Sequence, residues 1–169
     1  MSTKWILDPT HSEITFKVRH MMISNLKGEF TIFHAEIEAK NDDFTNAKTT
    51  AEIDVNSIFT NNADRDNHLK NSDFFNVEQH SKIIFKSDSV NGEISGNLTM
   101  NGITKSVILD IDFGGINKDP WGNTKAGFSF SGKINRSDFG LTWNAALETG
   151  GVMVSDEVKI AGELQFVKQ

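Results

Sequence analysis

Hydrophobic and polar residues alternate with a period of two along most of this chain. Ile14, Phe16 and Val18, for example, share one face while polar residues occupy the positions between them. Such alternation places successive side chains on opposite faces of a β-strand, one buried and one exposed to solvent. The pattern recurs along nearly the whole chain and predicts an all-β protein.

One segment changes face partway along. Between residues 26 and 40 the apolar positions move from even numbers, Phe30 and Ile32, to odd numbers, Phe33 and Ala35. A shift of one residue is the effect of a β-bulge, which bends a strand where a sheet turns a corner. We therefore expect a bulge here, with Phe30 and Ile32 both facing inward.

Turn-forming residues separate the predicted strands. The turn segments are Asn91-Gly92, Asn101-Gly102, Gly114-Gly115 and residues 119–122. About eight strands with short connections fit either a sandwich or a closed barrel. A barrel of about eight strands has room for its own side chains or for one small ligand.

Residues 62–75 are the one segment in which we expect a helix. Asn61 or Asn62 is its predicted N-cap, and Asp64 lies in its first turn. The apolar residues of this segment are few, so the helix is expected to lie over an end or a side of the sheet structure.

The aromatic composition predicts an unusually dry interior. The chain has 169 residues, which fits one domain over residues 1–169, and it contains thirteen Phe, three Trp and no Tyr. Phe offers only apolar surface, whereas Tyr carries a hydroxyl that needs a partner. A Phe-rich core and a Phe-lined cavity both fit this composition.

Charge and cysteine content exclude several classes of function. The net charge is −6, no basic stripe is visible in the sequence, and there is no Cys. We therefore do not expect binding to nucleic acid phosphates, or binding to anionic lipid headgroups through a polybasic segment. Disulfides, thiolate catalysis and Cys metal sites are excluded. The sequence shows neither an apolar signal segment nor a membrane span, so we expect a cytoplasmic protein without stable membrane insertion.

Five short sequence motifs occur in a fixed order along the chain. They are residues 5–12, 16–21, 65–75 leading into 83–87, 96–105 and 135–141. Together they resemble the YceI-like family of bacterial lipid-binding barrels, and the resemblance extends over residues 4 to 168.

The resemblance implies a fold and a ligand. The implied fold is a single antiparallel eight-stranded lipocalin-like β-barrel with one short inserted helix. The implied ligand is a polyisoprenoid or isoprenoid-quinone lipid inside the barrel, for carriage, storage or a stress response. None of these motifs is a catalytic signature, so we expect neither enzymatic activity nor a cofactor. Many members of the family are periplasmic.

The candidate ligand-binding residues are those expected to face the barrel interior or to lie at its mouth. They are Phe16, Val18, His20, Phe30, Ile32, Ile53, Arg65, His68, Phe85, Leu98, Leu109, Ile111, Phe113, Phe128, Phe130, Leu164 and Phe166. Small barrels can be filled by their own side chains, so each apolar member either packs the core or contacts the ligand.

Arg65, Asp66 and His68 form the most conspicuous polar cluster. Arg65 and His68 are candidates to hydrogen-bond a quinone or phosphate headgroup. In the structural alternative, Arg65 pairs with a carboxylate and the cluster pins the helix to the barrel. Asp66 and His68 are two residues apart and do not share a helix face, which makes an acid–base pair geometrically poor. We favour the structural role, since ion-pair networks often resemble catalytic sites.

Three functions remain open. The leading hypothesis is a lipid-binding barrel, and the alternatives are an enzyme acting on a lipid-like or amide substrate at the barrel mouth and a filled, ligand-free stress-related module. No two of the five His residues have the spacing of a metal site, so no metal is expected, and His20 is interpreted as a semi-buried residue at the end of the tunnel. Polar outer strand faces leave open a homodimer through one barrel face.

Overall fold

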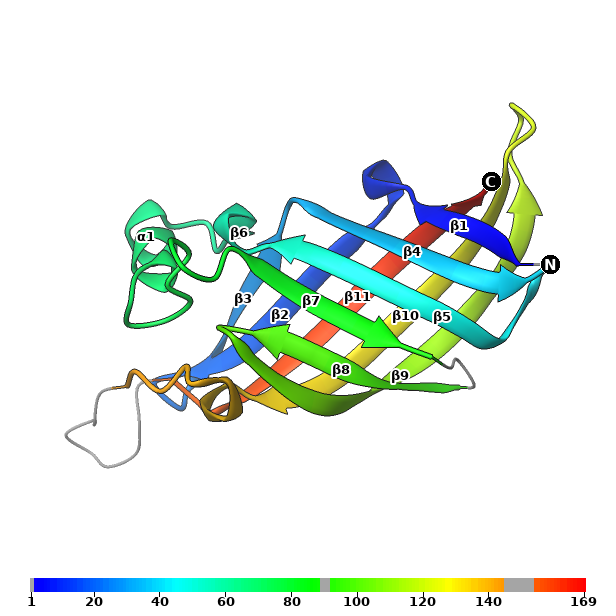
Figure 1. Cartoon of the computed structure of the whole chain (residues 1–169). Coiled ribbons are helices and arrows are strands. Elements are labelled where there is room, and N and C mark those ends of the chain that lie inside the picture. Colours follow the sequence, from blue (N-terminus) through cyan, green and yellow to red (C-terminus); the bar gives the residue numbers. More distant parts are fainter. Residues whose placement is uncertain (1, 89–91, 145–153) are drawn as a thin grey trace.

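Long antiparallel strands dominate the computed structural model, which describes residues 2–88, 92–144 and 154–169 (Figure 1). The strands are β1 Thr3–Leu7, β2 Glu13–His20, β3 Ser24–Phe30, β4 Phe33–Lys40, β5 Asp43–Asp54, β6 Ile58–Phe59, β7 Lys82–Ser87, β8 Glu93–Met100, β9 Ile103–Lys118, β10 Thr124–Asn135 and β11 Glu157–Lys168. The helical segments in the same ranges are η1 Pro9–His11, η2 Val55–Ser57, α1 Ala63–Lys70 and η3 Arg136–Phe139.

The sheet closes on itself. Strand β1 pairs with β4 on one side and with β11 on the other, which joins β1, β4, β5, β7, β8, β9, β10 and β11 into a ring. Strand β11 also pairs with β2, so β2, β3 and β6 extend the wall toward α1. Closure leaves the ring without a free edge. The expected eight-stranded antiparallel barrel is confirmed.

The change of face occurs at a break between β3 and β4. Thr31 N donates to Ser57 O at 3.2 Å and Asp54 N donates to Ile32 O at 3.0 Å, which ties the break to the η2 region. Phe30 is buried, whereas Ile32 is 60% exposed. The expectation that Ile32 faces inward was wrong, because the face changes before Ile32 and the backbone breaks instead of bulging.

The turn predictions had mixed outcomes. Asn101-Gly102 joins β8 to β9 with both φ angles positive, and residues 119–122 join β9 to β10, as predicted. Gly114-Gly115 was wrongly predicted as a turn, since β9 runs through it and only the register with β10 shifts, at Gly127. The fourth predicted turn includes Asn91, which lies outside the described residues.

Helix α1 is shorter than predicted. Asn62 Oδ1 accepts a hydrogen bond from Arg65 N at 3.0 Å, which confirms the predicted N-cap. The helix ends at Lys70 instead of residue 75. Beyond it, Asp73 N donates to Asn71 Oδ1 at 2.9 Å, and such local bonds compete with helix continuation.

Two groups of buried side chains divide the barrel interior. The packed cluster consists of Trp5, Leu7, Ala35, Ile37, Ala39, Phe44, Ala47, Ala126, Phe128 and Phe166. The α1-side cluster consists of Phe30, Val55, Ile58, Phe74, Phe75, Ile83, Phe85, Ile94, Leu98, Met100, Leu109, Phe139 and Leu141. Helix α1 lies at one end of the barrel, and both ends of the chain lie toward the other (Figure 1).

Candidate functional site

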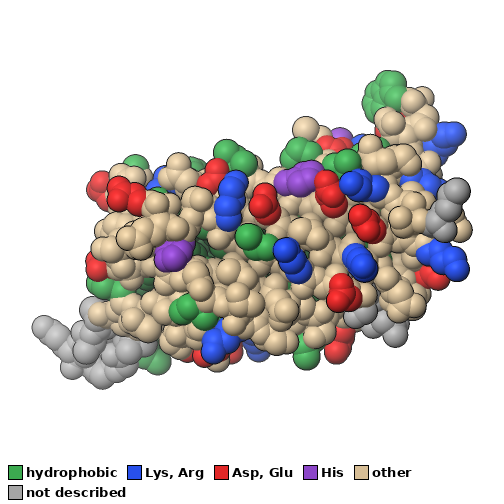
Figure 2. Space-filling model, viewed as in Figure 1, with side chains coloured by type: hydrophobic (Ala, Val, Ile, Leu, Met, Phe, Trp, Pro, Cys, Tyr) green, Lys and Arg blue, Asp and Glu red, His purple; other side chains and the backbone are tan. Residues whose placement is uncertain are grey.

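A partly open cavity of about 530 Å³ occupies the α1 side of the barrel. Its volume falls in the range of about 300–1,000 Å³ that is typical of small-molecule sites. Figure 2 shows a hollow in the barrel surface toward α1, with hydrophobic side chains inside it. This cavity does not fit the interpretation of a barrel filled by its own side chains.

All but three of the candidate ligand-binding residues line this cavity. Those that line it are Phe16, Val18, His20, Phe30, Ile53, Arg65, His68, Phe85, Leu98, Leu109, Ile111, Phe130, Leu164 and Phe166. Their position in the lining is a structural result, and their contact with a ligand stays a prediction.

The three remaining candidates lie elsewhere. Ile32 is on the outside. Phe113 and Phe128 face inward, but they stack at 5.1 Å between ring centroids beside Phe44 in the packed half of the barrel, and Phe113 is 48% exposed. Their assignment to the cavity was wrong, because alternation predicts the face of a residue and not its height along the barrel axis.

Glycines opposite phenylalanines keep the cavity open. Phe16 pairs across the strands with Gly28, and Phe130 pairs with Gly162. A Cβ on Gly28 would lie 2.3 Å from Phe16 Cζ, and a Cβ on Gly162 would lie 2.2 Å from Phe130 Cε1. Each ring therefore lies against the wall in space that only glycine leaves free. The barrel axis stays clear as a result.

The Arg65 cluster attaches α1 to the chain that leaves β6. Arg65 Nε donates to Thr60 Oγ1 at 2.8 Å, and Thr60 N donates to the buried Asp66 Oδ1 at 2.9 Å. His68 Nε2 lies 3.0 Å from Asp73 Oδ2 instead of facing Asp66. The cluster pins the helix, as the structural alternative predicted, but Arg65 does so through Thr60 and not through a carboxylate.

Sequence reasoning assigned no role to two residues at the α1 end of the cavity. Trp143 lines the cavity, with its ring 4.9 Å from that of His68. The buried Arg136 donates to the carbonyl oxygens of Leu141 at 2.7 Å and of Trp143 at 2.8 Å, and burial lowers the pKa of its guanidinium. Arg136 also donates to Ser155 O at 2.9 Å, so it joins two segments of the cavity wall. Trp143 lies outside any alternating pattern. Arg136 continues the inward parity of Phe130 and Ile134 in β10, but a charged residue at a strand end carries no apolar signal.

Comparison with known proteins decides the family. Residues 5–166 match the model of the YceI-like domain. This chain belongs to the YceI-like family. A UPF0312 protein of Staphylococcus epidermidis is 42% identical over 166 residues, and the alignment covers 97% of each chain. The UPF0312 protein of Staphylococcus aureus strain N315 is 40% identical with the same coverage.

Solved structures show the same YceI-like fold. The YceI protein of Campylobacter jejuni is 32% identical with a TM-score of 0.75, covering 89% of this chain and 90% of its own. BcnA of Burkholderia cenocepacia is 19% identical with a TM-score of 0.80, covering 94% and 98%. A domain from Saccharophagus degradans that is described as polyisoprenoid-binding is 15% identical with a TM-score of 0.70, covering 98% of both chains.

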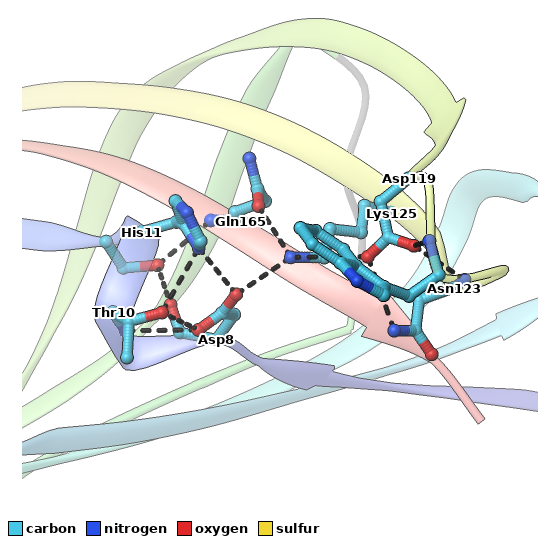
Figure 3. Close-up of polar contacts among 9 residues, drawn as sticks. Asp8, Thr10, His11, Asp119, Asn123, Lys125 and Gln165 are labelled. Carbon is cyan, nitrogen blue, oxygen red and sulfur yellow. Dashed lines mark hydrogen bonds and ion pairs between the residues drawn. The ribbon is translucent and has the colours of Figure 1, made fainter.

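A second polar network of this YceI-like barrel lies at the packed half (Figure 3). Lys125 Nζ donates to Asp8 Oδ2 at 3.0 Å and to Gln165 Oε1 at 3.2 Å. Hydrogen bonds from Thr10 above all, and from His11 and Lys125, hold the pKa of Asp8 well below its usual range although burial opposes this. The network joins the β1–β2 junction to β10 and β11, so its role is structural.

In residues 2–88, 92–144 and 154–169, no three His, Asp or Glu side chains converge as metal ligands. No helix in these ranges is long and apolar enough to cross a bilayer.

Proposed function

We propose that this YceI-like protein binds one polyisoprenoid-type lipid, such as an isoprenoid quinone, in the α1-side cavity, for carriage or storage. The observation that carries the proposal is a cavity of about 530 Å³ lined almost wholly by hydrophobic side chains. A prenyl tail has no hydrogen-bonding group, so its affinity must come from buried apolar area. Enclosing several hundred Å² at ~25 cal/mol per Å² yields on the order of 10 kcal/mol before ordering costs are subtracted.

The family supports this ligand class. The Saccharophagus degradans domain with the same fold is described as polyisoprenoid-binding. We place the tail along Phe16, Phe85 and Phe130 and the headgroup near Arg65 and His68, because these two polar residues line the cavity beside α1.

We propose a binding protein and not an enzyme. An acid–base pair would need Asp66 and His68 to face a common substrate. Asp66 instead accepts hydrogen bonds from Thr60, and His68 is bonded to Asp73. The carboxylate of Asp66 is thereby occupied in holding the helix.

Native mass spectrometry of freshly purified protein, paired with organic extraction of the same sample, tests the proposal. We expect a discrete added mass that is recovered as a prenyl lipid. Protein that is empty, and that also takes up no added isoprenoid quinone in detergent solution, would contradict it.

A further inference from the structure

Four lysines that are far apart in the sequence form one row on the outside of the barrel. Lys27 of β3 pairs with Lys17 of β2, Lys17 pairs with Lys159 of β11, and Lys159 pairs with Lys133 of β10. All four side chains are exposed. We expected no basic stripe from the sequence, and that expectation was wrong at this face. Strand pairing brings single lysines from four different strands next to one another.

This row is not explained by stability. Like charges directly opposite one another on neighbouring strands destabilise a sheet. Lys133 Nζ lies 3.9 Å from Glu157 Oε1, but no described carboxylate lies within 4.0 Å of the amines of Lys17, Lys27 or Lys159. Within the described residues, three adjacent cations therefore have no carboxylate at ion-pair distance, in a protein whose net charge is −6.

The hairpin that carries two of these lysines ends in an apolar tip, Met21-Met22-Ile23. Met22 is 57% and Ile23 76% exposed. Met21 and Met22 have φ angles of 52° and 63°, in the left-handed region that turns normally fill with Asn or Gly. Turn chemistry therefore does not explain these side chains, and exposed apolar residues at such a position indicate a contact surface.

The tip lies beside the cavity. His20, the residue before the tip, lines the cavity and pairs with Val154, which also lines it. Arg19 donates from its guanidinium to Met22 O at 3.1 Å and holds the turn. In Figure 1 the β2–β3 turn lies at the α1 end of the barrel, away from the β9–β10 turn.

We propose that the Met21-Met22-Ile23 tip and the lysine row of Lys17, Lys27, Lys133 and Lys159 dock the barrel on an anionic phospholipid bilayer. At about 3.3 Å per residue, Lys17 is about 13 Å from the tip along β2. Apolar side chains of peripheral proteins enter about 5–10 Å into the headgroup region, so the row then faces lipid phosphates. Docking brings the α1 end of the cavity to the membrane. That this orientation serves lipid exchange rests on the proposed function.

Co-sedimentation with phosphatidylcholine vesicles, with and without phosphatidylglycerol, tests the surface. We expect binding that depends on phosphatidylglycerol and weakens with salt. Each lysine near such a surface changes affinity about five-fold, so the double variant Lys17→Gln/Lys27→Gln should bind about twenty-five-fold more weakly. Met22→Ser/Ile23→Ser should lose about ten-fold or more through lost apolar burial.

Matched controls separate the proposed surface from charge and hydrophobicity in general. Lys82→Gln/Lys86→Gln removes the same charge from β7, and Trp121→Ser removes an 83% exposed apolar side chain from the β9–β10 turn. Neither should change vesicle binding by more than about two-fold. Control variants that weaken binding as much as the tip and lysine variants would overturn the proposal.

Quinone uptake in detergent solution separates this inference from the proposed function. We expect all four variants to take up quinone like the wild type, since none of the changed residues lines the cavity. Quinone uptake without any vesicle binding would overturn the docking surface and leave the proposed function standing. Vesicle binding that follows the variants as predicted, without quinone uptake, would support the surface and contradict the proposed function.

Discussion

The two halves of the barrel interior use the same residue, phenylalanine, to opposite effect. In the packed half, the rings of Phe44 and Phe128 meet at 5.0 Å between centroids, and Trp5 lies 5.2 Å from Phe44. In the α1-side half, the rings of Phe16 and Phe130 lie over glycines of the neighbouring strands. One half is therefore largely filled and the other hollow, and Leu7, Ala35 and Phe166 of the packed cluster also line the cavity.

Comparison of Phe128 with Phe130 indicates that the residue across the strand influences whether an aromatic ring fills the interior or lies against the wall. Phe128 pairs with Phe113 and Leu164, so its ring has no room against the wall. Phe130, two residues along the same strand, pairs with Ile111 and Gly162, and its ring lies over the glycine. A cavity in such a barrel depends on small residues as much as on large ones.

Truncation of a ring should have its largest effect on stability in the packed half. Phe44→Ala removes a buried ring that contacts three aromatic neighbours, and we expect a loss of about 3–5 kcal/mol in the free energy of unfolding. Phe16→Ala, in the hollow half, should cost clearly less, because one side of its ring already faces the cavity. Urea denaturation of both variants measures the difference.

Lipid uptake by the same two variants should reverse that order. Phe16→Ala is expected to weaken quinone binding, whereas Phe44→Ala, if folded, should leave it nearly unchanged. If Phe16→Ala and Phe44→Ala lose equal stability and equal quinone affinity, the division of the interior into two halves is contradicted.

Filling the space under a ring should close the cavity. In Gly162→Ala the added methyl group meets the Phe130 ring and, at 2.9 Å, the backbone oxygen of Glu13, so we expect the ring to turn into the lumen and the strand contact with β2 to loosen. We expect quinone uptake to fall at least ten-fold, with a stability loss of about 1–3 kcal/mol from overpacking. Gly127→Ala is the matched control, since a Cβ on Gly127 meets nothing within 4 Å. Unchanged uptake by Gly162→Ala would show that the glycine does not maintain the cavity.

The alternation of the sequence predicted the strands and most of the inward faces, and the family resemblance implied the barrel. Neither predicted the division of the interior. Phe128 and Phe130 have the same parity, and nothing local distinguishes them. What separates them is the residue opposite, and Gly162 is far away in the sequence. The lysine row that includes Lys17 and Lys159 was missed for the same reason, since pairing partners follow from register. Arg136 was missed because its acceptors are backbone carbonyls.

The smallest expected effect concerns the polar network outside the packed half. The pKa of Asp8 is lowered in the folded state, so its stabilising contribution is present above the unfolded value near about 3.9 and is lost as the pH falls through the folded pKa. Asp8→Asn should cost about 1 kcal/mol near neutral pH, a figure suited to a partly exposed charged network. The difference in the free energy of unfolding between Asp8→Asn and the wild type should shrink below about pH 4.

Urea denaturation of Asp8→Asn and the wild type at neutral and acidic pH checks this sign. Quinone uptake should not change, because Asp8 does not line the cavity. A stability difference that grows as the pH falls would refute the assignment.

The most direct test of a lipid in the hollow half uses the three tryptophans as position markers. Trp143 lines the cavity, Trp5 is buried in the packed cluster, and Trp121 is exposed on the β9–β10 turn. Three proteins that each keep one tryptophan, with the other two changed to phenylalanine, are titrated with an isoprenoid quinone, which quenches fluorescence on contact. We expect strong, saturable quenching of Trp143 and little change in the fluorescence of Trp5 and Trp121. Quenching of Trp5 equal to that of Trp143, or none at Trp143, would contradict this expectation.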